Sequence, residues 1–436
     1  MELLVILLAV GIQLFLTYKK VSPFLSLLFI AILSGLLLGM EPMQLVKSIE
    51  KGVGSTLGGL ALIICLGAIL GKILESSGAA EKIATTLINS FGPKRIQWAV
   101  LLTGFLVGLP LYYNAGFVIL VPLVFSISRK ANLPLLYVAI PMAASLSATH
   151  CFLPPHPAPV FLVNAFGADM GKTLIYGLLI TVPVVIIAGP LLGRNLRSIK
   201  LQLTEPVIAQ EPQPAKALPP VLPSFLLGLL PVILITLAVV ATYFLPEGNL
   251  QKFFLFLGDP TIALLCSVFL ATWQLGIQRG HSATTTMRWL NEAIAGIAGI
   301  MLIITAGGVF KQVLQDSGTD QYIAAFSTRW RMPPLIFAWT VTAFLRITIG
   351  SATVAGITAA GVVTPLVASG AASPELMVLA VGTGSVFGSH VNDSGFWMFK
   401  EFFNLSMKQT FLSWTVMESI ISVAGLGGIL LLELVV

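Results

Sequence analysis

The stretch Leu66–Ala84, LGAILGKILESSGAAEKIA, returns 240 positions later as Ala306–Ala324, AGGVFKQVLQDSGTDQYIA. Glycine, leucine, serine, isoleucine and alanine occupy matching positions in the two stretches. The same offset aligns Pro134–His150 with Pro374–His390, which share proline, leucine, valine, serine and histidine in register. Two blocks with one common offset in a chain of 436 residues indicate an internal duplication.

The composition places this duplication in a membrane protein. Hydrophobic residues make up 56% of the chain, charged residues make up 10%, and the mean hydropathy is +0.96. Apolar runs near the ~20 residues needed to cross a bilayer recur from end to end. The pI of about 9.2 does not indicate nucleic-acid binding, because Lys and Arg lie in short turns between apolar runs. A duplicated, strongly apolar chain is typical of secondary transporters in the lipid bilayer.

The hydropathy pattern predicts ten full spans and two longer apolar stretches. The stretches 96–128 and 333–369 could each be two spans or one re-entrant helical hairpin. Hairpins are favoured, because most basic turns then lie on the cytoplasmic side, although Arg329 and Arg331 depart from that pattern. The first span is expected to remain in the mature protein, with its N-terminus outside. The ten predicted spans are 3–18, 22–40, 54–74, 134–150, 172–192, 223–245, 259–278, 290–310, 374–390 and 409–435.

With these hairpins, each half of the chain contains five spans and one hairpin. An odd number of spans inverts the second half relative to the first, which is the arrangement that alternating access requires. The connector contains QEPQPAKALPPVLP, a polar and Pro-rich sequence typical of an extended linker. We therefore predict an all-α polytopic membrane protein in which two inverted repeats, 1–193 and 223–436, flank a cytoplasmic linker, 194–222.

Four interruptions of helix are predicted within the membrane. Two are 149–157, THCFLPPHP, and 389–395, SHVNDSG, which contain prolines or cap-forming residues. The other two are the hairpin tips at 110–114 and 350–353. Non-helical backbone inside a bilayer is tolerated only where it is buried in protein or lines a wet cavity. Exposed N–H groups at helix ends bind anions, so a small carboxylated polyol fits this chemistry, as other small anions would.

The candidate substrate-binding residues are the polar side chains at these four interruptions. Histidine is also a plausible proton carrier, because its unperturbed pKa lies near 6.5. His150 and His390 alternatively cap their preceding helices, and His156 alternatively packs in its loop. The candidates for substrate binding are Asn114, Thr149, His150, His156, Arg346, Ser351, Thr353, His390, Asn392 and Ser394. The candidates for proton coupling are Asp393, His150 and His390.

Asp393 and Arg346 are the charged candidates. A carboxylate beside a broken intramembrane helix is costly and usually functional. The alternative for Asp393 is to cap the following helix, with Asn392 and Ser394 assisting. Arg346 lies one turn before the second tip, where it could pair with Asp393 or attract a substrate carboxylate. Its alternative is snorkelling or a structural tie to backbone carbonyls.

Four stretches of the chain are distinctive: FLPPHPAP (152–159), FKQVLQDSG (310–318), RITIGSATVAGITAAG (346–361) and SHVNDSGFWMFKEFFNLSMKQTFLSWTVMESIISVAGL (389–426). SHVND and GSATVA are the specific motifs. Together the stretches resemble the gluconate permease family of sugar-acid:proton symporters, and the resemblance covers essentially the whole chain. It implies a bacterial inner-membrane importer of gluconate or a close aldonate, with the inverted-repeat fold of the ion-transporter superfamily. It also implies a homodimer with an elevator motion, and a proton as coupling ion with no other cofactor.

The chain departs from this family at Asn114. Better-known members tend to carry an acidic residue there, in a motif resembling FYEVGF, whereas this chain has YYNAGF. Because an asparagine cannot titrate, coupling must rest on Asp393 and the histidines, or this member is coupled differently.

Other functions are weighed against this one. A related transporter of another hydroxy acid (a hexuronate, idonate or a D-serine-like substrate), a passive organic-anion channel and a nutrient sensor are the alternatives. An enzyme is not indicated, because the sequence has no H-E-x-x-H motif, no G-x-S-x-G motif and no acidic metal cluster.

Overall fold

The computed structural model describes residues 19–92, 95–199, 218–318 and 332–436, together with scattered residues before position 19. The described residues form helices and connecting turns and contain no strand, so the all-α prediction is confirmed. The predicted span 3–18 is described only in part. Arg329, Arg331 and most of the predicted linker lie outside the described residues.

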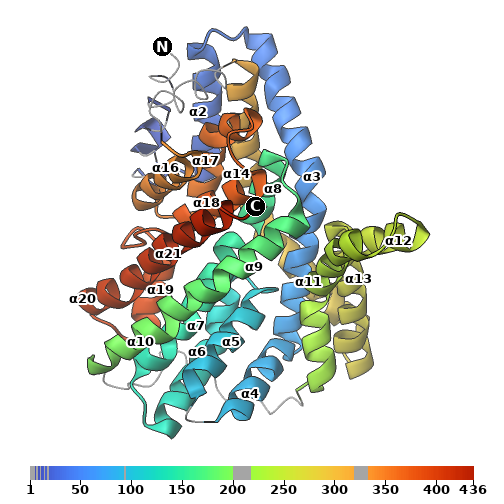
Figure 1. Ribbon diagram of the computed structural model, residues 1–436, viewed down its shortest axis with the longest axis vertical. Helices are drawn as coiled ribbons and strands as arrows, with labels where there is room; N and C mark the ends of the chain where they lie inside the picture. Colours follow the sequence, from blue (N-terminus) through green and yellow to red (C-terminus); the bar gives the residue numbers. More distant parts are fainter. Residues whose placement is uncertain are drawn as a thin grey trace.

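The first half of the chain contains a long helix followed by shorter ones (Figure 1). A π-helical turn, η2, continues α9 into α10. The elements are α2 (Pro23–Leu37), α3 (Pro42–Ser76), α4 (Ala79–Phe91), α5 (Ile96–Gly108), α6 (Tyr113–Ala131), α7 (Leu135–Phe152), α8 (Pro157–Phe166), α9 (Met170–Ile186), η2 (Ile187–Leu191), α10 (Leu192–Asn195) and η3 (Leu196–Ser198).

The second half has a similar sequence of elements. A second long helix, α14, precedes two short helices and a broken one. The elements are α11 (Val221–Phe244), α12 (Asn249–Leu257), α13 (Pro260–Ala271), η4 (Thr272–Gly276), η5 (Ile277–Arg279), α14 (Ala283–Asp316), α16 (Pro334–Ile349), α17 (Ala352–Ala368), α18 (Pro374–Gly384), α19 (Ser394–Phe402), α20 (Met407–Thr410), η6 (Phe411–Thr415) and α21 (Val416–Glu433).

Local sequence signals explain where many of these helices begin. α3, α8 and α13 carry proline in the first turn, where its missing N–H has no helical partner to lose. Asp169 caps α9 by accepting a hydrogen bond from the Lys172 N–H at 2.7 Å. Ser282 caps α14 by accepting from the Thr285 N–H at 3.1 Å. These caps fix the helix starts without tertiary contacts.

Seven described helices are long and apolar enough to cross a membrane. They coincide with seven of the ten predicted spans, namely 54–74, 134–150, 172–192, 223–245, 259–278, 290–310 and 409–435. The predicted span 22–40 is the 15-residue helix α2. The predicted span 374–390 is too long, because α18 ends at Gly384 and gives way to turns. Residues 382–385 read Gly-Thr-Gly-Ser and residues 388–389 read Gly-Ser there, and glycine and serine favour helix ends over helix interiors.

Both longer apolar stretches divide into two helices at the predicted tips. The first becomes α5 and α6, of 13 and 19 residues, and the second becomes α16 and α17, of 16 and 17 residues. All four are shorter than the ~20 residues typical of a full span. In Figure 1, α4, α5 and α6 lie towards one end of the long axis, while α2, α16 and α17 lie towards the other.

The two longest described helices, α3 and α14, pack against each other. α3 has 35 residues and α14 has 34, so each is about 50 Å long at a rise of 1.5 Å per residue. A Cβ on Gly52 would lie 2.7 Å from the Val309 Cα, and a Cβ on Gly308 would strike the Thr56 side chain. Small residues therefore let the two backbones approach closely, as in other membrane helix pairs.

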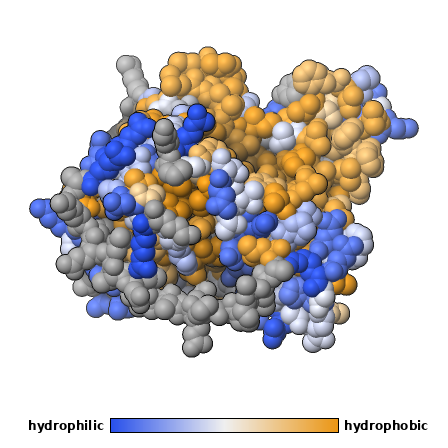
Figure 2. Space-filling model, turned by 90° about the horizontal axis from the view of Figure 1, so that it is seen from below, coloured by the Kyte–Doolittle hydropathy of each residue, from blue (hydrophilic) through white to orange (hydrophobic). Residues whose placement is uncertain are grey.

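The outer surface carries many large apolar side chains. Phe244 and Phe269, for example, are 81% and 66% exposed. Figure 2 shows a broad hydrophobic surface in its upper right part and hydrophilic residues gathered in its left and lower parts. Exposed apolar surface of this extent is what a surface in contact with lipid presents.

Candidate substrate-binding site

The second hairpin tip touches the second helix break. Gly350 follows α16 with a φ of +83°, a conformation that favours glycine. A Cβ on Gly350 would also strike the Asn392 backbone oxygen. The Asn392 side chain donates from Nδ2 to the Ile347 carbonyl at 2.7 Å and to the Thr348 carbonyl at 3.4 Å. Asn392 thus satisfies the last carbonyls of α16 and ties the break to the tip.

Asp393 and Arg346 form an ion pair beside this contact. The Arg346 Nη2 donates to the Asp393 Oδ2 at 2.5 Å. Arg346 is 3% exposed, and the Asp393 side chain is 15% exposed. Asp393 also accepts hydrogen bonds from the Ser389 hydroxyl and, at 2.9 Å, from the Gly395 N–H. Asp393 therefore caps α19, as its alternative role predicted, and it pairs with Arg346, as expected for one role of that arginine.

Ser389 links this pair to the helix that follows. The Trp414 Nε1 donates to the Ser389 hydroxyl at 2.7 Å, and the Thr415 hydroxyl donates to the Ser389 carbonyl at 2.6 Å. Trp414 lies in η6, a π-helical turn, and such turns are frequent at functional sites. Sequence reasoning missed Ser389 and Trp414, because neither residue type is distinctive in an apolar chain.

Arg346 retains unused donors inside the protein. Its Nε and Nη1 atoms are buried and make no hydrogen bond with any described residue. A buried donor without a partner costs free energy, so such groups are rare in folded proteins and call for an explanation. These atoms can donate charge-assisted hydrogen bonds to an anion.

The first hairpin and the first break also meet. The His156 Nε2 lies 2.8 Å from the Gly108 carbonyl, just before the first tip. His156 and His150 face each other through their Nδ1 atoms at 3.4 Å. The ring of Tyr112, at the tip, lies 6.2 Å from that of His150 and 6.0 Å from that of His156 between centroids.

When both rings are neutral, the donor and acceptor of the His150–His156 hydrogen bond are fixed. A carbonyl only accepts, so His156 must carry its proton on Nε2 and accept at Nδ1. His150 must then donate from Nδ1, which leaves its Nε2 as an acceptor. His150 Nε2 is therefore the atom of the pair that can take up a proton.

The remaining candidates occupy different environments. The Thr149 hydroxyl donates its hydrogen to the Ser145 carbonyl of its own helix at 2.9 Å, so only its oxygen lone pairs are left to accept a hydrogen bond. Ser351 caps α17 by accepting from the Val354 N–H at 3.4 Å. His390 accepts from the Asn392 N–H at 3.5 Å. Three residues make no side-chain hydrogen bond with another described residue; these are the exposed Asn114 and Ser394 and the half-buried Thr353.

The two halves of the site meet between the first tip and η6. The Tyr113 ring lies 5.6 Å from the Trp414 ring between centroids, in an edge-on arrangement. The Tyr113 hydroxyl is buried and makes no hydrogen bond with any described residue. Through Trp414 and Ser389, the first tip is thus connected to the Arg346–Asp393 pair.

Sequence reasoning also missed Glu418. This glutamate of α21 is 2% exposed, and its carboxyl interacts with the Ser147 hydroxyl of α7. A signal was present, because Glu418 is an acidic residue inside a predicted span and such residues are usually functional.

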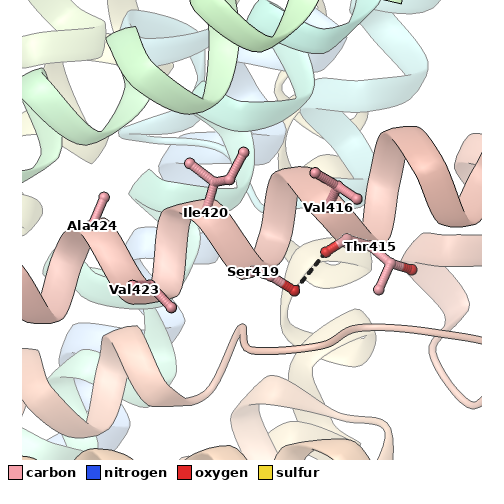
Figure 3. A pocket seen from close by; sticks show the side chains of 6 residues that line it. All are labelled: Thr415, Val416, Ser419, Ile420, Val423 and Ala424. Carbon is pink, nitrogen blue, oxygen red and sulfur yellow. Dashed lines mark hydrogen bonds between the residues drawn. The ribbon is translucent and has the colours of Figure 1, made fainter.

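A separate pocket of about 470 Å³ lies along α21 (Figure 3). Its lining is almost entirely apolar, and its Ser419 hydroxyl donates to the Thr415 carbonyl at 2.8 Å. At 100° per residue, the lining residues occupy the face of α21 opposite Glu418. This pocket therefore lacks the free polar groups that a sugar acid needs. It is lined by Thr415, Val416, Ser419, Ile420, Val423 and Ala424.

No group of three metal-ligating side chains occurs among the residues that the structure describes.

Known proteins with related sequences are transporters. A high-affinity gluconate transporter of Escherichia coli (strain K12) is 48% identical over 438 residues, which cover 99% of each chain. The Gnt-II system L-idonate transporter of the same strain is 46% identical over 434 residues, also 99% of each chain. A gluconate permease of Bacillus subtilis (strain 168) is 42% identical over 456 aligned positions that cover both chains completely.

Two solved structures share the fold. The Alcanivorax borkumensis YdaH transporter has a TM-score of 0.66 at 17% identity, covering 94% of this chain and 97% of that chain. Neisseria gonorrhoeae MtrF has a TM-score of 0.70 at 15% identity, covering 95% of this chain and 96% of that chain. These likenesses concern the fold alone.

The family model of GntP family permeases matches residues 1–435. With seven helices able to span a membrane and with bacterial permeases as relatives, the chain is an integral protein of the bacterial inner membrane. The match across the whole chain and identities of up to 48% to curated transporters show that the chain belongs to the GntP family of permeases, which are transporters and not enzymes.

Proposed function

We propose that this permease imports gluconate, or a closely related sugar acid, together with protons. The observation that carries the proposal is the buried Arg346, which is paired through Nη2 with Asp393 while Nε and Nη1 lack partners among the described residues. A cation at two broken helices fits a carboxylate substrate. Relatives named gluconate transporter or permease, at 48% and 42% identity, support gluconate as that substrate.

The polar groups around the two tips would bind the hydroxyls of the substrate. Asn114 and Thr353 are the best placed, because each lies at a tip and neither makes a side-chain hydrogen bond with a described residue. Ser351, Asn392 and Ser394 lie at the second tip and its break, and the first break adds Thr149 and His156. The side chains that already make hydrogen bonds within the protein would exchange them for hydrogen bonds to the substrate.

Import further requires a change of conformation. Arg346 is 3% exposed, so a substrate reaches its guanidinium only after the surrounding elements separate. We propose two inverted repeats, 1–193 and 223–436, joined by the linker 194–222, and an elevator motion in a homodimer. The helix bounds support the repeats, since Pro42–Ser76 shifted by 240 positions falls on Ala283–Asp316 to within one residue. The two hairpins at opposite ends of the long axis in Figure 1 also support inversion.

The coupling proton would be bound close to the substrate. Asp393 adjoins Arg346 directly, and His150 offers a free Nε2 at the first break. His390 lies three residues before Asp393 and is the third candidate. Protonation of any of them cancels a negative charge or adds a positive one, and a single charge at the membrane centre costs roughly 2.5–3.5 kcal/mol.

L-Idonate is the second candidate substrate, because a relative named as an L-idonate transporter is 46% identical over 99% of both chains. Counterflow in proteoliposomes tests the choice. Vesicles loaded with unlabelled gluconate should take up labelled gluconate, and external gluconate should compete better than idonate, glucuronate, D-serine or the uncharged glucitol. If idonate competes better than gluconate, idonate is the preferred substrate. If uncharged glucitol competes as well as gluconate, Arg346 does not recognise the substrate carboxylate.

A further inference from the structure

We propose that Glu418 is a further proton-binding residue of the transport cycle and that it shares the charge of Arg346 with Asp393. This inference rests on the proposed proton-coupled import. It concerns a residue of α21 that lies outside the four helix interruptions.

Glu418 is almost completely enclosed between the two halves of the chain. It is 2% exposed, and its Oε1 makes no hydrogen bond with any described residue. Its carboxyl interacts with the Ser147 hydroxyl of α7, in the first half. A buried carboxyl with so few donors is far from the solvation that an ionised carboxylate needs.

The charged and titratable groups around Glu418 come from several elements. Arg346 of α16 and Asp393 of the second break both interact with it electrostatically. Tyr113 of α6 and Cys151 of α7 interact with Glu418 as well. The cluster therefore contains one cation and two carboxyl groups, with a phenol and a thiol that are neutral at ordinary pH.

The two carboxyl groups differ in the donors around them. If both were ionised, one guanidinium would face two negative charges and the buried cluster would be negative overall. Asp393 has three donors, the Arg346 guanidinium, the Ser389 hydroxyl and the Gly395 N–H. Glu418 interacts with the Ser147 hydroxyl, and its Oε1 has no partner among the described residues. Because fewer donors stabilise an ionised Glu418, placing the extra proton of the cluster on Glu418 costs less.

This arrangement couples proton and substrate. A gluconate carboxylate bound to Arg346 adds a negative charge to the cluster, which favours the protonated form of Glu418. By linkage, a proton on Glu418 must strengthen the binding of gluconate by the same factor. Coupling of this kind needs no acidic residue at Asn114, so it explains how a chain with YYNAGF at the first tip remains coupled to protons.

The test compares Glu418→Gln with Glu433→Gln in proteoliposomes. Glutamine imitates the protonated acid, so the first variant should lose gradient-driven accumulation of gluconate and retain counterflow. Glu433 is an exposed acid of the same helix, and its variant should behave like the wild type. In the wild type, gluconate affinity should fall by about tenfold per pH unit between the pH at which the free protein releases the Glu418 proton and the higher pH at which the gluconate complex releases it, and Glu418→Gln should abolish this slope.

Two results would overturn the inference: normal accumulation by Glu418→Gln, or an unchanged pH slope of gluconate affinity in that variant. Accumulation that is absent in the wild type would instead overturn the proposed function, so the two failures are distinguishable.

Infrared difference spectroscopy of the wild type keeps the test decisive if Glu418→Gln does not fold. Addition of gluconate should produce the C=O stretching band of a protonated carboxylic acid, and Glu418→Asp should shift that band. A wild-type difference spectrum without such a band, or a band unchanged in Glu418→Asp, would contradict the assignment.

Discussion

Replacing Arg346 with glutamine tests how the site recognises a carboxylate. Glutamine keeps the aliphatic stem and an N–H donor, but it is two bonds shorter and removes the charge. Two consequences follow from the contacts of Arg346. The substrate loses its charge-assisted hydrogen bonds, and Asp393 loses the ionic partner at its Oδ2.

The loss of gluconate affinity and the loss of folding stability can be measured separately. A hydrogen bond to a charged group contributes about 1.5–3 kcal/mol, so losing one raises the Kd of gluconate about 10- to 150-fold. Removing one partner of a buried ion pair costs about 3–5 kcal/mol of folding free energy. The cost should lie near the lower limit, because Asp393 retains Ser389 and Gly395 as donors and its side chain is 15% exposed.

Binding and stability should be measured on the same purified protein. Calorimetry with gluconate and with uncharged glucitol gives the affinities, and thermal unfolding in detergent gives the stability. Adding Asp393→Asn to Arg346→Gln should restore much of the lost stability, because the unpaired charge is removed. An equal loss of affinity for gluconate and glucitol would refute carboxylate recognition by Arg346. A double variant no more stable than Arg346→Gln alone would refute the explanation of the stability loss by an unpaired charge.

Three further changes test other parts of the site. Gly350→Ala should destabilise the protein by about 1–3 kcal/mol in thermal unfolding, because alanine disfavours the left-handed backbone and its Cβ meets Asn392; unchanged stability would contradict this packing. His156→Phe should cost about 1–3 kcal/mol by leaving the Gly108 carbonyl unsatisfied, and a variant as stable as the wild type would show that the hydrogen bond is unimportant. Asn114→Ala should raise the KM of gluconate about 3- to 10-fold by removing one neutral hydrogen bond of about 1 kcal/mol, whereas an unchanged KM would exclude Asn114 from the substrate site.

The parts of the fold that sequence could predict depend on local chemistry. Apolar length identified the seven long spans, because each must cross the same bilayer. Both tips contain a residue that disfavours helix interiors, a proline in 110–114 and a glycine in 350–353, although Pro122, Pro141 and Pro365 lie inside helices. The pairing of Arg346 with Asp393 was one of two expected roles, because few other charges lie in apolar surroundings.

The remaining features depend on tertiary contacts that no local pattern encodes. Ser389 becomes important only because the fold places Trp414 and Asp393 on either side of its hydroxyl. The segment 246–258 lies between two predicted spans, yet it contains α12, whose nine residues have no buried member. The sequence shows Glu418 as an acidic residue inside a predicted span, but no local pattern places Ser147 of α7 and Arg346 of α16 beside it.

Accumulation of labelled gluconate by the purified wild type in proteoliposomes, with and without an inward proton gradient, tests the central claim most directly. The claim predicts a peak internal concentration above the external one when the gradient is present, and simple equilibration when the gradient is collapsed with a protonophore. Equilibration under both conditions would show a passive pathway for gluconate and would contradict proton-coupled import.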